Sequence, residues 1–575
     1  MKNKQWLQVA VLVTICVVVY GNSLFNGFVY DDIGTIVENE HIADFWTNLP
    51  AFFTSSYFKI AGIEASYRPI ATFSYYVLYA IFGLNPVGYH LFSLLVHILN
   101  VIMVYLLMNR LQKNKVTSLF AGLLFACHPA LTEAVNCISY NEDLLAAFFF
   151  LAALLFYIRA DDAGQRAGVK YYPLSLFFFL SGLLSKEMAI ALPAVILVYD
   201  FFLKAAQDGK MSAGPAMGIF KERFFYYCGY LAIGIFYLAL RFFILAGPRQ
   251  FFSYSYGSLI ERIIYLPYHL FGFVKIALFP TDLNADYVFS YPENFFQPAN
   301  MLSLLLIAAL GVLSFFLFKK SRLLPFGIFW FFIMLFPVSN LIQIANPVAD
   351  RYLYLPLVGF CIVVATVLTG DGRLLRMKNR RLEPIKWLIV ILILLVYASL
   401  SMTRNRDWKD NLALWTKTVQ SSPGSFVAHG SLGRVFQERG RLDEAIAEYE
   451  KAIEINPADA KAYYNLGTIF EKQARVKDAI AQYQKSIDAN PDFRDAHFNL
   501  ANIYAQNGLL AEAIPLYQNV IRLDPEDLEA RNNLGVVYAR QGKLEEAVAE
   551  WEKLLKLDPA NASARGNIEK ARSLN

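Results

Sequence analysis

Two adjacent carboxylates, Asp31 and Asp32, follow the first apolar run of the sequence. Neighbouring carboxylates at a membrane surface repel each other, and burial raises the pKa of a carboxylic acid. Such a pair suits a general base that takes a proton from a hydroxyl, or a ligand for a cation. A solvated turn or a helix cap explains the two residues equally well, so the pair alone does not decide between these interpretations.

Further ionisable residues border later apolar runs, where charge is costly and tends to be functional. Three cations, Arg68, Lys186 and Arg351, are suited to hold an anionic phosphate while a carboxylate deprotonates a hydroxyl. We expect the supporting residues of such a site to be Glu40, His128, Glu133, Asp143 and Glu187. Taken singly, Lys186 and Glu187 form a plausible structural ion pair, and His128 resembles a helix-end histidine.

The sequence has no Gly-rich nucleotide loop, Walker motif or dinucleotide-binding fingerprint. A soluble nucleotide sugar or ATP is therefore not indicated as a substrate. The five cysteines all fall in apolar runs and lack the spacing of a zinc site or a disulfide framework. We predict that no cofactor and no metal site is present; a divalent cation is not indicated, but the sequence leaves open whether the reaction needs one.

The elements that position these residues are predicted to be membrane spans. The chain is 56% hydrophobic over 575 residues, with a mean hydropathy of +0.38, which indicates a polytopic membrane protein. A span needs roughly 20 apolar residues. About eleven segments qualify: 6–25, 87–108, 116–136, 142–158, 172–185, 187–203, 224–246, 300–318, 323–343, 349–369 and 386–402.

Basic residues mark the cytoplasmic ends of spans. Their clusters alternate correctly only if the segment 258–280 does not cross, so we predict that it is a re-entrant or interfacial helix on the outer side. The N-terminus, which resembles an uncleaved signal anchor, is then inside. The loops 25–86 and 247–299 and the C-terminal repeats are outside, with the polar residues described above.

The C-terminal part is a predicted helical repeat. Prolines recur every 34 residues, at Pro423, Pro457, Pro491, Pro525 and Pro559, which is the period of tetratricopeptide hairpins. The repeats carry 19 Lys and Arg against 23 Asp and Glu, whereas the preceding chain carries 33 against 24. That basic excess fits cytoplasmic loops beside anionic lipid rather than nucleic-acid binding. We predict a membrane domain over 1–403, a linker and first helix over 404–422, and repeats over 423–575.

One repeat position is not explained by packing. Asn465, Asn499 and Asn533 share a single offset in successive hairpins, and stacking turns a fixed offset into a line along one surface. The arrangement is similar to the asparagine ladder of the nucleocytoplasmic O-GlcNAc transferase, in which amides grip an extended peptide. The alternative is that these asparagines make internal helix contacts.

Several motifs together resemble the transmembrane and tetratricopeptide-repeat O-mannosyltransferases. These motifs are Tyr30-Asp31-Asp32, Asn39-Glu40, Tyr67-Arg68-Pro69, His128-Pro129 with Thr132-Glu133, Lys186-Glu187, Phe279-Pro280 with Asp286-Tyr287, and Arg351-Tyr352 with Tyr354. The resemblance implies a GT-C membrane fold and sugar transfer from a polyprenyl phosphate to Ser or Thr of proteins. It also implies that Asp31 and Asp32 are catalytic. Tyr140-Asn141 stands where the family pattern leads us to expect Gly-Arg.

The sequence therefore predicts an all-α membrane glycosyltransferase with an extracytoplasmic repeat array that binds acceptor proteins. The short array is similar to bacterial relatives, which places the chain in a bacterial inner membrane. The predicted partners are a polyprenyl-phosphate-linked sugar, acceptor proteins and membrane lipid. Two alternatives stay open: a non-catalytic scaffold for envelope complexes, and a GT-C enzyme with a glycolipid acceptor.

Overall fold

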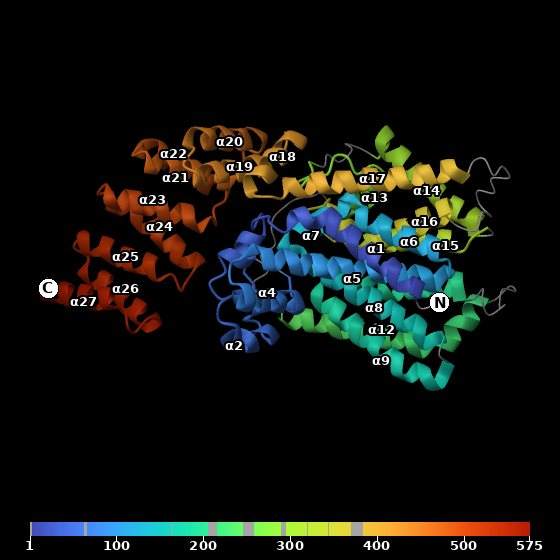
Figure 1. Cartoon of the computed structure of the whole chain (residues 1–575). Helices are drawn as coiled ribbons and strands as arrows, with labels where there is room; N and C mark the ends of the chain where they lie inside the picture. Colours follow the sequence, from blue (N-terminus) through green and yellow to red (C-terminus); the bar gives the residue numbers. More distant parts are fainter. Residues whose placement is uncertain are drawn as a thin grey trace. The chain divides into compact units, whose positions relative to one another are not determined.

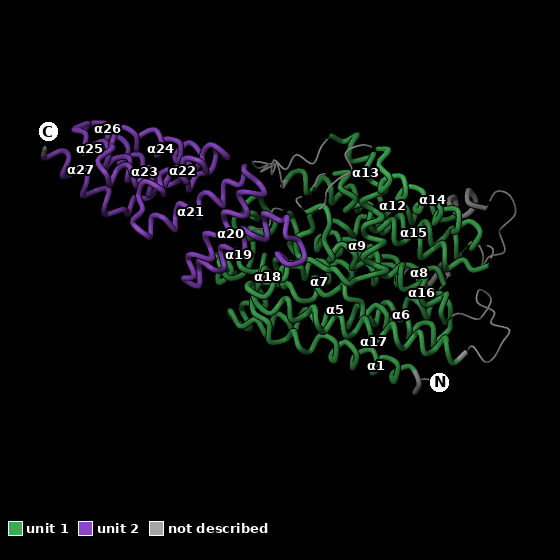
Figure 2. Tube along the Cα trace, turned by 90° about the horizontal axis from the view of Figure 1, so that it is seen from above, with its two compact units in different colours: residues 1–417 green, residues 418–575 purple. Residues whose placement is uncertain are grey.

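The computed structural model describes residues 3–574 except for 63–65, 163, 205–214, 245–257, 289–294, 319, 343, 345 and 370–382. Every regular element in these ranges is a helix, so the all-α prediction is confirmed. The chain divides into two compact units, residues 1–417 and 418–575 (Figure 2). The division falls inside the segment 404–422 that the sequence marks as a linker. Several of the basic residues that mark the predicted cytoplasmic ends lie outside the described residues: Lys2, Lys210, Lys319 and the basic residues from Arg373 to Arg381.

The first unit is a bundle of long helices joined by short ones (Figure 1). Its longer helices are α1 (Asn3–Tyr20), α4 (Pro69–Phe82), α5 (Pro86–Gln112), α6 (Lys115–Cys127), α8 (Asn141–Asp162), α9 (Gly164–Ser185), α10 (Leu192–Tyr199), α12 (Pro215–Ile244), α13 (Leu259–Leu278), α14 (Pro298–Phe318), α15 (Leu323–Leu335), α16 (Pro356–Thr369) and α17 (Glu383–Asp407). The helix α18 (Asn411–Ser421) begins in the first unit and ends in the second. The shorter α-helices are α2 (Phe45–Asn48), α3 (Tyr57–Ile60) and α7 (Thr132–Asn136).

Six helices in the described residues are long and apolar enough to cross a membrane, so the chain is a membrane protein. They match the predicted spans 6–25, 87–108, 142–158, 224–246, 300–318 and 386–402. Large apolar side chains on their outer faces are exposed, with Phe225 at 84% and Phe243 at 76%. Lipid is the environment that such faces require, because a soluble monomer rarely exposes so much apolar surface.

The other predicted spans correspond to shorter or bent helices. The segment 116–136 forms α6 and α7 with a bend of 56° between them, and 323–343 and 349–369 contain the short apolar helices Leu323–Val338 and Pro356–Thr369. The segment 258–280 forms one unbroken helix, α13. That it is a re-entrant or interfacial helix on the outer side stays a prediction.

The centre of the first unit is built on α5 and α8, whose span windows are 61% and 72% buried. α5 begins at Pro86, where the side chain of Asn85 caps the helix by accepting a hydrogen bond from the Val87 amide. α15 and α16 cross at Gly327 and Gly359. A Cβ on Gly359 would lie 2.4 Å from the carbonyl oxygen of Gly327, so the two backbones approach more closely than any larger residue allows.

The second unit consists of four helical hairpins and a final helix (Figure 2). The helices are α19 (Phe426–Glu438), α20 (Leu442–Ile455), α21 (Ala460–Lys472), α22 (Val476–Ala489), α23 (Arg494–Gln506), α24 (Leu510–Leu523), α25 (Leu528–Arg540), α26 (Leu544–Leu557) and α27 (Ala562–Leu574). Each hairpin packs on the next, as the 34-residue period predicts. The recurring alanines Ala445, Ala479, Ala513 and Ala547 are completely buried where the helices meet.

Candidate active site

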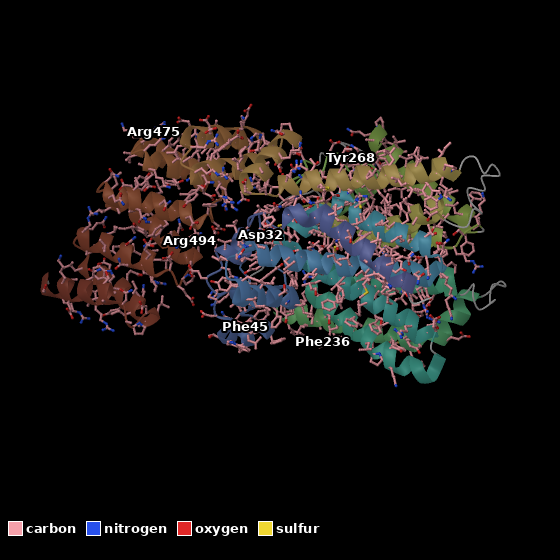
Figure 3. The ribbon with its side chains drawn as sticks, in the orientation of Figure 1. Asp32, Phe45, Phe236, Tyr268, Arg475 and Arg494 are labelled. Carbon is pink, nitrogen blue, oxygen red and sulfur yellow. The ribbon has the colours of Figure 1, made fainter. Side chains whose placement is uncertain are left out.

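The acidic pair lies in the turn that follows α1, at the end of the bundle away from the N-terminus (Figure 3). Tyr30, the residue before the pair, has a positive φ of 57°, which is uncommon for a residue with a side chain. Its backbone amide donates to the side-chain oxygen of Asn411 at 2.8 Å. This contact with α18 holds the turn in the conformation that separates the environments of Asp31 and Asp32.

Asp32 is completely buried and is held by backbone amides. One carboxylate oxygen accepts the amide of Ser139 at 2.7 Å, and the other accepts the amide of Val29 at 3.1 Å. Burial raises the pKa of Asp32 to about 6, although the amide of Ser139 acts in the opposite direction. Asp32 therefore ties the turn after α1 to the short helix η5 (Ile138–Tyr140).

Asp31 is only half-buried. Its Oδ2 accepts a hydrogen bond from the hydroxyl of Tyr140 at 2.8 Å, and in the part of the chain that the structure describes no donor bonds to its Oδ1. Burial raises the pKa of Asp31 above 3.8, while the charge of Arg351 lowers it. Of the two carboxylates, Asp31 is thus the one with an oxygen left for an incoming hydroxyl.

Arg351 connects the acidic pair to a buried ion pair. Its guanidinium contacts the carboxylate of Glu133, and its backbone amide donates to the other oxygen of Glu133 at 3.0 Å. The same guanidinium lies 4.1 Å from the centre of the Tyr140 ring and 5.1 Å from that of Tyr352, as in cation–π contacts. Arg351 therefore fixes the ring whose hydroxyl binds Asp31.

Lys186 and Arg68 belong to a second, adjoining group of charges. The Lys186 ammonium lies 2.6 Å from Asp143 and 2.9 Å from Glu142. Arg68 lies 2.5 Å from Glu142 and 3.0 Å from Glu187. Lys186 is also 6.0 Å from the centre of the Tyr352 ring, so Tyr352 stands between the two groups.

The structure thus joins most of the predicted site residues into one charged cluster around Tyr140 and Tyr352. Each of the three predicted phosphate-binding cations, Arg68, Lys186 and Arg351, is paired with at least one carboxylate. A phosphate would have to bind the outward N–H groups of these pairs rather than isolated cations. Their role towards a donor stays a prediction.

Two predicted supporting residues lie apart from this cluster. Glu40 is exposed and lines a separate cavity of about 440 Å³ with Asn39 and Tyr79. His128 is buried, and its Nε2 lies 3.0 Å from the carbonyl oxygen of Ala277 while its Nδ1 accepts the amide of Ala130. With both ring nitrogens bonded to backbone, His128 is a helix-end histidine, which was the structural alternative for this residue.

Two contributors were not singled out from the sequence. Tyr140 binds Asp31, yet in the sequence it stands out only as a departure from the family pattern. Glu142 joins Arg68 to Lys186, and its only sequence signal is its place beside Asp143. Among the described residues, no three His, Cys, Asp or Glu side chains are grouped as a metal site requires. Whether the reaction needs a divalent cation is left to assay.

In the second unit, the three repeated asparagines are half-buried between helices. The amide of Asn499 lies 3.3 Å from the hydroxyls of both Tyr464 and Tyr483. The amide of Asn533 lies 3.3 Å from the side-chain oxygen of Asn502. The donors of Asn499 and Asn533 therefore serve contacts inside the array.

Comparisons with known proteins match both parts of the chain. Residues 68–240 match the family described as dolichyl-phosphate-mannose-protein mannosyltransferase. That range includes Arg68, Glu133, Asp143 and Lys186 but not the acidic pair. Residues 433–473, 464–518, 502–542 and 528–561 match tetratricopeptide repeats.

The curated relatives include Protein O-mannosyl-transferase TMTC3 of Mus musculus, which is 26% identical over 480 residues, covering 78% of this chain and 51% of the relative. Protein O-mannosyl-transferase TMTC1 of Homo sapiens is 27% identical over 475 residues, covering 75% of this chain and 53% of the relative. The chain thus spans about half the length of the curated relatives it matches.

Solved structures match only a part of the chain. YrrB, a TPR protein with an unusual peptide-binding site, is 24% identical with a TM-score of 0.27, covering 28% of this chain and 82% of its own. MamA is 26% identical with a TM-score of 0.24, covering 26% of this chain and 86% of its own. From the family matches and the relatives together, residues 68–240 are similar to a mannosyltransferase family, the C-terminal part is similar to tetratricopeptide repeats, and the chain is similar, at 26–27% identity, to proteins named protein O-mannosyl-transferases.

Proposed function

We propose that the chain is a membrane glycosyltransferase that moves a sugar, mannose or another hexose, from a polyprenyl-phosphate donor to Ser or Thr of proteins. The observation that carries this proposal is the half-buried carboxylate of Asp31, bonded to the Tyr140 hydroxyl at 2.8 Å beside a cluster of paired cations. A scaffold has no need of such a cluster at the end of a membrane bundle. The homology to proteins named O-mannosyl-transferases supports the same reaction.

In the proposed reaction, Asp31 takes the proton of the acceptor hydroxyl. The hydroxyl oxygen attacks the anomeric carbon of the sugar, and the bond between that carbon and the phosphate oxygen breaks. The polyprenyl phosphate leaves with the electron pair of that bond. Asp32 does not touch the reactants in this scheme, because its oxygens hold the Ser139 and Val29 amides. Asp32 positions Asp31 instead.

The cations would hold the donor phosphate through those N–H groups that are not hydrogen-bonded to their carboxylate partners. Arg68 and Arg351 suit this role because a guanidinium carries five donors and a carboxylate occupies at most two of them in a bidentate pair. The half-exposed Glu187 is the partner of Arg68 that a phosphate would displace most readily, with 32% of its side chain accessible. The reaction is proposed to occur on the extracytoplasmic side of a bacterial inner membrane.

The repeat array would bind the acceptor protein. Tetratricopeptide arrays offer a continuous surface on which a peptide can lie extended. The amide nitrogen of Asn499 is used internally, so in this proposal its carbonyl oxygen accepts a hydrogen bond from the acceptor backbone.

The test is transfer from a polyprenyl-phosphate mannose to an acceptor by the purified full chain in lipid nanodiscs. Asp31→Asn removes the base without changing its shape, and loss of a general base typically costs roughly 10²–10⁴-fold in rate. Asp44→Asn makes the same chemical change at an exposed aspartate of the same loop and is the matched control. Wild-type turnover by the Asp31→Asn protein would show that the catalytic assignment is wrong.

The two other functions predict different results in the same assay. A scaffold would show no transfer with any donor while still binding its protein partner through the repeats. An enzyme with a glycolipid acceptor would transfer sugar to lipid extracted from the nanodiscs and would not label the protein acceptor.

A further inference from the structure

A hollow lies at the other end of α8, the helix whose first turn carries Glu142 and Asp143 of the proposed active site. It encloses about 820 Å³ between the C-terminal ends of α5 and α8 and the N-terminal half of α9. Arg159 in α8 lies 17 residues after Glu142, which at a rise of about 1.5 Å per residue places it about 25 Å away along the helix. The hollow is therefore separate from the acidic pair and its cluster.

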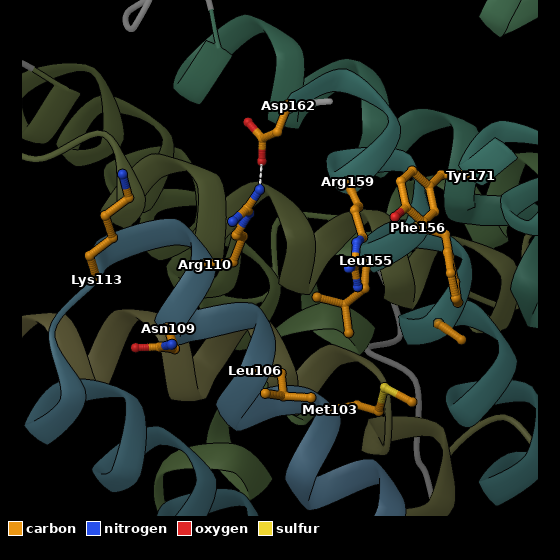
Figure 4. Close-up of a pocket in the computed structure, with 11 residues that line it drawn as sticks. Met103, Leu106, Asn109, Arg110, Lys113, Leu155, Phe156, Arg159, Asp162 and Tyr171 are labelled. Carbon is orange, nitrogen blue, oxygen red and sulfur yellow. Dashed lines mark hydrogen bonds and ion pairs between the residues drawn. The ribbon is translucent and has the colours of Figure 1, made fainter. Parts of the chain in front are cut away.

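The walls of the hollow divide into a charged rim and an apolar interior (Figure 4). The rim carries Arg110, Lys113 and Arg159, with Asp162 as the one acidic residue among the lining residues. Arg110 is paired with Asp162. In the part of the chain that the structure describes, no carboxylate is paired with Lys113 or Arg159, and both side chains are exposed.

Arg159 is held in place by an aromatic ring. Its guanidinium lies 4.9 Å from the centre of the Tyr171 ring, a contact that fixes the cation without neutralising its charge. Lys113 ends α5 in a left-handed conformation with φ 57°. Two cations from two different helices thus border one opening.

The interior below the rim is lined by long apolar side chains. Met103 and Leu106 contribute from α5, and Leu155 and Phe156 contribute from α8. The candidate spans Pro86–Gln112 and Ile138–Asp162 end at this level. The rim therefore lies where the headgroups of a bilayer meet its hydrocarbon.

We propose that this hollow is a binding site for an anionic phospholipid. The phosphate of the headgroup would bind at the rim that carries Lys113 and Arg159, and an acyl chain would lie along Met103, Leu106 and Leu155. The unpaired positive charge favours an anionic over a zwitterionic headgroup. Each basic residue near an anionic lipid surface adds a similar amount to the electrostatic attraction between the protein and the lipid. The apolar interior favours a lipid over a free phosphate, which has nothing to place there.

The experiment uses the purified full chain in detergent and native mass spectrometry to count bound lipid. The protein is titrated with dioleoyl phosphatidylglycerol and, in a separate series, with dioleoyl phosphatidylcholine. We expect Lys113→Gln combined with Arg159→Gln to weaken phosphatidylglycerol binding about 25-fold, about fivefold for each cation. Phosphatidylcholine binding should change little. Lys113→Arg combined with Arg159→Lys keeps the charge and should keep the affinity.

The matched control is Lys320→Gln, which removes an exposed cation between α14 and α15 that does not line the hollow. If the control loses as much phosphatidylglycerol affinity as the double glutamine variant, the attraction is non-specific and the proposal is overturned. Unchanged phosphatidylglycerol affinity in the double glutamine variant would also overturn the proposal. Displacement of the lipid by glycerol 3-phosphate at equal concentration would show a site for a soluble phosphate instead of a lipid.

Discussion

Arg351→Ala should destabilise the protein strongly, because Arg351 forms a buried ion pair with Glu133. The side chain of Glu133 is completely buried and that of Arg351 is 9% accessible. Removing one partner of a buried ion pair leaves the other charge without compensation, which costs about 3–5 kcal/mol. The variant also loses the contact with the Tyr140 ring at 4.1 Å, worth about 0.5–2 kcal/mol.

Removing both charges should recover most of that loss. In Glu133→Gln combined with Arg351→Met, the glutamine oxygen can still accept the backbone amide of residue 351, which donates to Glu133 at 3.0 Å in the present structure. Replacing a whole buried pair with uncharged groups of similar volume is often neutral. We therefore expect a coupling energy at the upper end of about 0.5–3 kcal/mol in the double-mutant cycle.

The assay is unfolding of the purified protein in mild detergent, with donor binding measured on the same samples. Arg110→Ala is the matched control, since its partner Asp162 is exposed and the pair is 46% and 35% accessible; such a pair is worth about 0–1 kcal/mol. Arg351→Ala with wild-type stability, or a double variant less stable than either single one, would refute the reasoning. If the double variant is stable but has lost affinity for the donor, Arg351 is the residue that binds the donor phosphate.

Three further predictions concern topology, the repeats and pH. Cysteines at the exposed positions Ser56 and Ser421 should both react with an impermeant thiol reagent on intact cells and one at Lys113 should not; labelling of only one of the first two would contradict the topology. Asn499→Ala should lower the free energy of unfolding by about 1–3 kcal/mol, because two hydrogen bonds of about 0.5–1.5 kcal/mol each are lost, and an unchanged melting temperature would show that these contacts contribute nothing. Because burial raises the pKa of Asp31 above 3.8, kcat/KM should fall on acidification at a pH above that of a free carboxylate, and a pH-independent rate would exclude Asp31 as the base.

The sequence by itself determined the parts of this protein that depend on local patterns. Long apolar runs can satisfy their backbone polar groups in lipid only as helices, so six predicted spans coincide with membrane-length helices. The 34-residue period requires stacked hairpins, since a single hairpin cannot bury its apolar face alone. The acidic pair and the cations at span ends were also visible, because charge at such positions is costly.

The tertiary structure decided which of these polar residues meet. Arg351 and Glu133 are 218 positions apart in the sequence, and their pairing depends on how the bundle packs. The different environments of Asp31 and Asp32 arise from a turn at Tyr30 that is held by Asn411, 381 positions away. His128 is hydrogen-bonded to backbone groups, the Asn499 amide to tyrosine hydroxyls and the Asn533 amide to Asn502, because a buried polar group must find a hydrogen bond within the fold. Spacing along the chain carries no information about such partners.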